Sequence, residues 1–154
     1  MSIKIPKKGL KCAHLNICSL KNKVNELSSI LHDNDIHIMA ISETHLDNTI
    51  ADSVVSIQGY NFFRRDRDRF GGGTAFFLKE HIPAKIRNDL SRNGVEALWL
   101  QIHIPYSKPI LICCCYRPPC SNVDYLDNIC SMLQIVTDKN SEVFFCGRYE
   151  YQLV

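Results

Sequence analysis

Two groups of side chains in this sequence have residue types and spacings that could support metal chemistry. Cys12, His14 and Cys18 lie close together near the N-terminus. Their spacing matches no known zinc finger and no second ligand pair follows, so a structural zinc site is disfavoured. Glu43 lies just after a short apolar run. A carboxylate at the end of a rigid strand suits a hard cation such as Mg²⁺, although Glu43 could equally be a loop acid or a helix cap. His45 is interpreted as a surface histidine at the end of a strand.

Two further stretches could contact phosphate groups. Gly71–Gly73 is rich enough in glycine for a phosphate cradle, but it lacks the Lys-Ser/Thr pair and the following helix of a P-loop. A turn within a β-hairpin is the favoured interpretation. The alternating run Arg64–Arg69 (RRDRDR) could contact a DNA backbone or could form salt bridges within the same hairpin. The sequence leaves both alternatives open.

The composition is that of an ordinary globular domain. The chain has 154 residues, of which 45% are hydrophobic and 22% charged, so we expect one domain rather than a disordered chain. The net charge of +2 does not indicate a particular binding partner, but the charges are unevenly distributed along the chain. Residues 1–25 carry +6, residues 26–58 carry −6 and residues 59–92 carry +4. The basic blocks could meet phosphates or could be solvated faces.

The sequence predicts an intracellular protein, nuclear or cytoplasmic, that is neither secreted nor bound to a membrane. No apolar run approaches the roughly 18 residues that a membrane span requires, and the basic N-terminus lacks the apolar core of a signal peptide. The eight cysteines are therefore expected to be reduced. Cys113–Cys115 lie in an apolar run and are predicted to be buried in a strand as small hydrophobic residues.

The hydrophobic periodicity predicts an α/β fold that starts with a β-α-β unit. Residues 10–17 and 36–41 are predicted strands. Between them, apolar residues recur at helical spacing from Leu20 to Leu31, and Ser19 is the expected N-cap. Further strands are expected at 61–67, 74–80, 84–89, 97–104, 109–116 and 142–146, and a second helix at 124–137.

An ordered series of short motifs runs along nearly the whole chain. The motifs are Leu15-Asn16, Ser42–Thr44, Ile57–Tyr60, Arg64–Arg67, Gly71–Gly73, Glu96–Leu100, Tyr116–Pro119 and Val143–Gly147. The series resembles the endonuclease/exonuclease/phosphatase superfamily, and more narrowly the endonuclease domain of non-LTR (LINE-type) retrotransposons. The resemblance implies a partial four-layer α/β sandwich, two mixed sheets flanked by helices. Residues 1–10 would be a basic N-terminal segment, and residues 11–154 the N-terminal portion of the domain.

The resemblance also implies an activity and its site. The activity would be Mg²⁺-dependent hydrolysis of phosphodiesters in DNA, with no small-molecule cofactor. Asn16 falls on the asparagine that orients the catalytic groups of the family, and Glu43 falls on the glutamate that binds the metal. Tyr116 falls on the tyrosine beside the scissile phosphate.

The final motif departs from the family pattern. Gly147 is followed by Arg148, Tyr149 and Glu150, where the family has Gly-Asp-Phe-Asn. Arg148 therefore takes the place of the aspartate that serves proton transfer, and an arginine stays protonated near neutral pH. Glu150 takes the place of an asparagine that binds a phosphate oxygen, and it would repel that oxygen instead.

We therefore expect a catalytically inactive fragment of a retrotransposon-derived endonuclease. The family continues with another metal-binding aspartate and a Ser-Asp-His segment, which this sequence lacks. An in-frame reverse transcriptase beside this sequence in the genome would show that the chain is a fragment of a longer element. The alternative is a non-catalytic remnant that binds nucleic acid weakly through its basic segments. An exposed sheet edge could also allow self-association.

Overall fold

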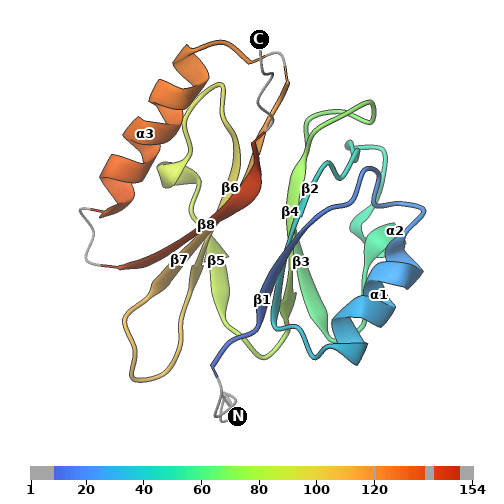
Figure 1. Cartoon of the computed structure of the whole chain (residues 1–154). Coiled ribbons are helices and arrows are strands. Elements are labelled where there is room, and N and C mark those ends of the chain that lie inside the picture. Colours follow the sequence, from blue (N-terminus) through green and yellow to red (C-terminus); the bar gives the residue numbers. More distant parts are fainter. Residues whose placement is uncertain (1–8, 120, 138–140, 150–154) are drawn as a thin grey trace.

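Two four-stranded sheets pack face to face in the computed structural model, which describes residues 9–119, 121–137 and 141–149 (Figure 1). The first sheet has the order β1-β2-β4-β3, and the second has the order β5-β6-β7-β8. The first-sheet strands are β1 (Cys12–Asn16), β2 (Ile38–Ser42), β3 (Tyr60–Arg65) and β4 (Thr74–Lys79). The second-sheet strands are β5 (Ala84–Ile86), β6 (Glu96–Ile102), β7 (Ile110–Arg117) and β8 (Glu142–Tyr149). The helices are α1 (Val24–Asp33), α2 (Asp52–Val55) and α3 (Asp124–Thr137), with a short 3-10 turn, η1, at Asn88–Leu90.

Both sheets are mixed. In the first, β1 and β2 are parallel, and β4 runs antiparallel to β2 and to β3. In the second, β5, β6 and β7 are antiparallel, and β8 is parallel to β7. A parallel pair needs a crossover connection, and the helices α1 and α3 supply the two crossovers, one for each sheet. The predicted fold class is therefore confirmed.

Three apolar clusters separate the layers. The central cluster fills the space between the sheets, and its members include Phe76, Leu78, Leu100 and Ile112. Each of the other two lies on the outer face of one sheet, under α1 in the first case and under α3 in the second, so the helices cover the outside of the sandwich (Figure 1). Alternate residues of a strand point to opposite faces, and this alternation allows both faces of each sheet to be buried.

Helix α1 starts later than the sequence predicts. The expected N-cap, Ser19, lies outside the helix, which begins at Val24 after Lys23 and has no side-chain cap. Cys18 and Ser19 instead have left-handed backbone conformations, with φ of 48° and 82°. Leu20 is nevertheless fully buried, so it packs into the core from the loop before the helix. The four-residue helix α2 was not predicted.

The cysteines of β7 behave as predicted. Cys113, Cys114 and Cys115 are reduced and fully buried. The thiol of Cys114 donates to the carbonyl of Ile41 at 3.2 Å, so it joins the two sheets directly. Burial raises the pKa of Cys113 and of Cys114, which keeps both thiols protonated. Within the described residues, no helix is long and apolar enough to cross a membrane.

Strand β8 forms an edge of the second sheet in the described part of the chain. Phe144 on this strand is 52% exposed, whereas Val143 and Phe145 pack against the cluster under α3. Ile110 and Ile112 of the neighbouring strand β7 are buried between the sheets. Self-association through this edge stays a prediction.

Tyr125 of α3 connects the helix to two strands, and its hydroxyl is expected to matter for stability. The hydroxyl donates to the carbonyl of Tyr116 and accepts from the backbone N–H of Glu96 at 3.2 Å. Burial raises the pKa of Tyr125, so the hydroxyl remains a donor. Replacing Tyr125 by phenylalanine should lower the free energy of unfolding by about 1–3 kcal/mol, because two buried backbone groups lose their partner. Urea denaturation measures the change, and an unchanged midpoint would contradict it.

Candidate functional site

Polar residues at the ends of the four strands form one row across the first sheet. Asn16 pairs with Ser42, Ser42 pairs with Thr74, and Thr74 pairs with Arg65. β1, β2 and β3 all end at this row, and β4 begins there. The row therefore marks one end of the sandwich, where side chains can leave the sheet and form a site.

Two loops beside this row are held together by backbone hydrogen bonds. The N–H of Ile17 donates to the carbonyl of Ser42 at 3.0 Å. The N–H groups of Ser19 and Leu20 donate to the carbonyls of Glu43 and Thr44, both at 2.9 Å. The loop that follows Asn16 is thus fixed against the loop that carries Glu43. Asn16 and Glu43, which the sequence suggested separately, therefore belong to one site.

The second sheet contributes Tyr116 to the same end. Tyr116 on β7 pairs with Glu96 on one side and with the backbone of Arg148 on the other. The Glu96 carboxylate accepts from the N–H of Gly73 at 3.1 Å and from Arg67 at 2.8 Å. The guanidinium of Arg67 lies 5.9 Å from the centre of the Tyr116 ring. These contacts link the polar end of the first sheet to that of the second.

Gly72 and Gly73 form the turn that connects these parts, as the hairpin interpretation predicted. The carbonyls of Gly72 and Gly73 accept from the N–H groups of His45 and Thr44, at 3.1 and 3.3 Å. Gly73 has φ of 86°, and a Cβ atom there would lie 2.3 Å from the Thr44 hydroxyl. Only glycine fits this backbone conformation and this space. The glycines therefore position the Glu43 loop and bind no phosphate through a P-loop.

Five buried side-chain polar atoms at this end have no hydrogen-bond partner in the described part of the chain. They are the amide nitrogen of Asn16, the hydroxyls of Thr44 and Thr74, one guanidinium nitrogen of Arg64 and one carboxylate oxygen of Asp66. A buried donor without an acceptor costs about 1–3 kcal/mol. An anionic oxygen that reached the Asn16 amide would remove that cost. The site is therefore suited to receive an oxygen-rich ligand.

A basic pocket of about 500 Å³ lies beside the row. Arg64, Arg65 and Arg92 line it together with Asn88, Ser91 and Asn93, and its other lining residues are Ile86 and Leu98. Arg65 donates to the carbonyl of Ala97 at 2.9 Å, which fixes the stem of its guanidinium. Within residues 9–119, 121–137 and 141–149, neither Arg65 nor Arg92 belongs to an ion pair. Both keep their charge available for a phosphate group.

The structure shows salt bridges within the alternating basic run, whereas contact of the run with DNA stays a prediction. Arg64 pairs with Asp66 at 3.5 Å and with Asp52 at 3.2 Å, so part of the charge is neutralised locally. Burial raises the pKa of Asp66, although the charge of Arg64 opposes this effect. Arg65 lines the basic pocket together with Arg64. The sequence could not assign the individual arginines, because two of the ion-pair partners, Asp52 and Glu96, lie outside the run.

Arg67 lies in the basic run that the sequence indicated, but its contact with Glu96 could not be predicted. Burial alone would lower the pKa of Arg67, but the hydrogen bond and charge of Glu96 raise it overall. Its guanidinium therefore stays charged beside the Tyr116 ring, where cation–π attraction adds to the ion pair. The partners are 29 residues apart in sequence, and the strand motif around Glu96 gave no local signal for the contact.

The potential metal ligands are grouped differently from the pattern near the N-terminus. Cys18, Glu43 and His45 bring one ligand atom each within 4.8 Å of one another, whereas Cys12 and His14 are not part of this group. The Glu43 and His45 side chains are half-buried, with Oε2 and Nε2 4.0 Å apart. His45 is thus a member of the site and not the plain surface histidine that the sequence suggested.

This donor set does not fit the Mg²⁺ that the family resemblance implies. Mg²⁺ prefers octahedral oxygen ligands and is usually held by one or two carboxylates together with substrate phosphates. In the part of the chain that the structure describes, the group supplies one carboxylate, and its other two members are a thiol and an imidazole. Sulfur and nitrogen are poor ligands for so hard a cation.

The last two residues singled out by the sequence are only partly placed. The backbone of Arg148 lies in β8 beside Tyr116, so the position is at the expected end of the sandwich. Glu150 lies outside the described residues. The roles of Asn16, Glu43 and Tyr116 stay predictions, although the structure brings all three to the same end of the fold.

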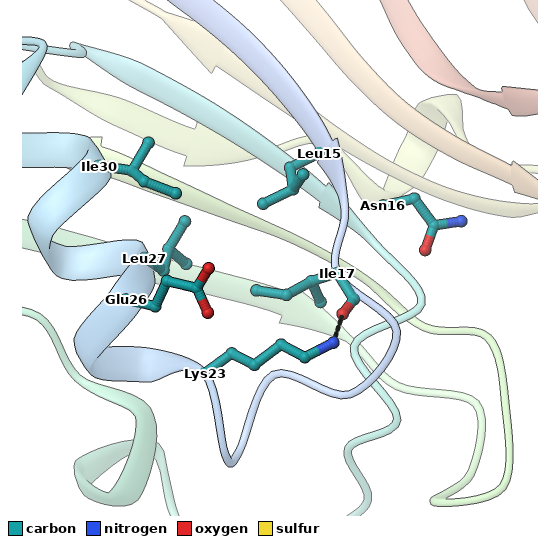
Figure 2. Close-up of a pocket in the computed structure, with 7 residues that line it drawn as sticks. All are labelled: Leu15, Asn16, Ile17, Lys23, Glu26, Leu27 and Ile30. Atoms are coloured by element: carbon teal, nitrogen blue, oxygen red, sulfur yellow. Dashed lines mark hydrogen bonds between the residues drawn. The ribbon is translucent and has the colours of Figure 1, made fainter.

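A second pocket near Asn16 is not part of this site. It measures about 220 Å³ and lies between α1 and the end of β1, with a mainly apolar lining. Figure 2 shows that the Asn16 side chain points away from the Lys23 and Glu26 side chains that line this pocket. The Lys23 ammonium group donates hydrogen bonds to the carbonyls of Ile17 and Cys18, at 2.6 and 3.0 Å.

Solved structures of known proteins share this architecture. The endonuclease domain of TRAS1, a telomere-specific non-LTR retrotransposon, superposes with a TM-score of 0.66 and 16% identity, over 87% of this chain and 56% of that domain. An AP endonuclease from Archaeoglobus fulgidus gives a TM-score of 0.68 and 17% identity, over 90% of this chain and 56% of that one. The 3′ phosphatase NExo from Neisseria, bound to a product DNA hairpin, gives a TM-score of 0.68 and 12% identity. The match covers 90% of this chain and 57% of that one.

These similarities establish the fold of the chain. It has the endonuclease/exonuclease/phosphatase fold, which nucleases and phosphatases share. The retrotransposon endonuclease named by the motif series is among the similar structures, so the resemblance is confirmed at the level of the fold. The chain spans a little over half the length of these structures. No family model and no curated protein sequence matches it.

Proposed function

We propose that this chain is a DNA-binding domain derived from a non-LTR retrotransposon endonuclease, and that it binds the phosphate backbone without hydrolysing it. The observation that carries the proposal is the polar end of the sandwich, where Arg65 lines a basic pocket. Asn16, at the other edge of the same sheet, and Tyr116 of the second sheet lie at this end as well. The nuclease fold and the motif series support the same class of ligand. NExo and TDP2, which share the fold, are known in complexes with DNA products.

Each group at this end has a distinct part in binding. Arg65 and Arg92 attract the phosphate backbone electrostatically and neutralise its charge. The side-chain amide of Asn16, which has no partner among the described residues, donates to a phosphate oxygen. Tyr116 is buried and has Arg67 against its ring, so it positions that guanidinium at the same end of the fold. These contacts read the backbone and not the bases, so little sequence preference is expected.

Hydrolysis needs a group that accepts or directs a proton, and the position beside Tyr116 no longer supplies one. Arg148 holds that position, and its guanidinium stays protonated at neutral pH. General acid–base catalysis contributes about 10²–10⁴-fold to the rate of a reaction. An extra positive charge strengthens phosphate binding while it removes this contribution. Binding without cleavage follows from the same substitution.

The proposal predicts that two arginines of the basic pocket dominate DNA affinity. Replacing Arg65 and Arg92 by alanine together should weaken binding to a short duplex by roughly tenfold and reduce the salt dependence of log K by about 2. Fluorescence anisotropy of a labelled duplex in EDTA, at several salt concentrations, measures both quantities. EDTA removes metal from the comparison, so the result depends on the protein charges alone.

The matched control is the double variant Lys11→Ala and Lys108→Ala, which removes the same charge at the opposite end of the sheets. Lys11 precedes β1 and Lys108 precedes β7, so both lie away from the polar row. This control should bind with nearly the affinity of the unchanged protein. Equal losses for the two double variants would show that the pocket is not the binding site.

A further inference from the structure

Two loops that are distant in sequence bring a thiol, an imidazole and a carboxylate to one point. Cys18 follows β1, whereas Glu43 and His45 follow β2. Their ligand atoms lie within 4.8 Å of one another. Cys18 is exposed and the other two side chains are half-buried, so an ion can reach the group from solvent. Around a tetrahedral zinc ion such atoms are roughly 3.5 Å apart, so small side-chain rotations close the group.

We propose that Cys18, Glu43 and His45 form a binding site for a borderline-soft divalent ion, with Zn²⁺ as the natural occupant. Cysteine sulfur, histidine nitrogen and glutamate oxygen are the three ligand types of zinc sites. Three protein ligands leave the fourth tetrahedral position for water, as in open zinc sites. On binding, the Cys18 thiol loses its proton to solvent and its sulfur bonds to the metal.

The loop geometry holds the three ligands before any ion arrives. The backbone hydrogen bonds from Ser19 to Glu43 and from His45 to Gly72 fix both loops, at 2.9 and 3.1 Å. Lys23 Nζ binds the Cys18 carbonyl at 3.0 Å, which anchors the ligand residue itself. Because the backbone is already fixed, less conformational entropy is lost when the ion binds. The family resemblance assigns Glu43 to Mg²⁺, but here Glu43 lies beside two softer ligands, the Cys18 thiol and the His45 imidazole.

Direct binding of metal to the full chain tests the inference without DNA or catalysis. Titration of the reduced protein with Zn²⁺ in a calorimeter should saturate at one ion per chain in the micromolar range, and millimolar Mg²⁺ should not displace the ion. Co²⁺ serves as a second probe, because a cobalt–thiolate bond gives an intense near-ultraviolet absorption and tetrahedral cobalt absorbs visible light. A phosphine reductant keeps the thiols reduced without competing for the metal.

The variants Cys18→Ser and His45→Ala should each lower Zn²⁺ affinity by at least about tenfold, the loss seen even when a supporting group of a metal ligand is removed. Cys18→Ser should also abolish the thiolate absorption of bound Co²⁺. The controls are Cys130→Ser on α3 and His103→Ala after β6, which replace residues of the same types outside the group. Both controls should bind like the unchanged protein.

The inference is overturned if the folded, unchanged chain shows neither Zn²⁺ saturation nor a cobalt–thiolate band. It is also overturned if Cys130→Ser reduces binding as much as Cys18→Ser. Far-ultraviolet circular dichroism establishes that each variant is folded. Because the DNA measurements above are made in EDTA, failure of the metal site leaves the DNA-binding proposal standing, and the reverse also holds.

Discussion

Replacing Gly147 by alanine is expected to lower the free energy of unfolding by about 4 kcal/mol or more, which is beyond the usual range for one substitution. Gly147 pairs with Cys115 in the parallel ladder between β7 and β8. A Cβ atom at residue 147 would lie 1.8 Å from the Cys115 carbonyl oxygen and 2.8 Å from its carbon. Both obstacles are backbone atoms of a buried strand, so neither can move without breaking the ladder. Chemical denaturation measures the loss.

Gly94→Ala is the matched control for this effect. Gly94 has φ of 80°, but a Cβ atom there would meet nothing within 4 Å. This change should therefore cost only the conformational strain of a left-handed residue, roughly 1–2 kcal/mol. If Gly147→Ala were no more destabilising than Gly94→Ala, β8 would not pair with β7 as described. The placement of Arg148 beside Tyr116 would then lose its basis.

Local periodicity was sufficient to predict most of the elements. Helix α3 occupies the predicted residues 124–137, because apolar residues such as Ile129, Met132 and Val136 recur at helical spacing and pack against one sheet. The strands β2 and β7 were predicted from apolar runs that are buried on both faces. Such signals are short-range, so they can be read along the chain without knowledge of tertiary contacts.

The start of α1 could not be predicted in the same way. Ser19 has a residue type that favours helix caps, but its backbone is fixed by a hydrogen bond to Glu43, which is distant in the sequence. That bond is compatible with a left-handed conformation at Ser19 and not with a helix cap. A tertiary contact therefore overrides the local preference.

The candidate site shows the same division between local and distant signals. Asn16 and Glu43 could be predicted to meet because each ends one of two predicted strands that the β-α-β unit makes parallel neighbours. The association of Cys18 with His45, and of Arg67 with Glu96, depends on loop conformations and on packing between the sheets. No spacing in the sequence encodes those contacts.

The second large effect concerns DNA cleavage, which is expected to be absent. The residue whose backbone pairs with Tyr116 is Arg148, and an arginine accepts no proton at neutral pH, so on the proposal above a contribution of about 10²–10⁴-fold to the rate is missing. The donor set around Glu43 contains one carboxylate, together with a thiol and an imidazole, and is a poor site for Mg²⁺. These two deficits act on different parts of the reaction, so their effects on the rate multiply.

Incubation of the purified chain with supercoiled plasmid and Mg²⁺ tests this account most directly. Glu43→Ala is the matched control, because it removes the carboxylate that the family resemblance assigns to the metal and lies in a loop outside the core. Gel electrophoresis separates supercoiled from nicked plasmid, so it measures the fraction of plasmid that each protein nicks under the same conditions. The account predicts equal, background-level nicking by the unchanged chain and by Glu43→Ala. Nicking by the unchanged chain above the level of Glu43→Ala would contradict it.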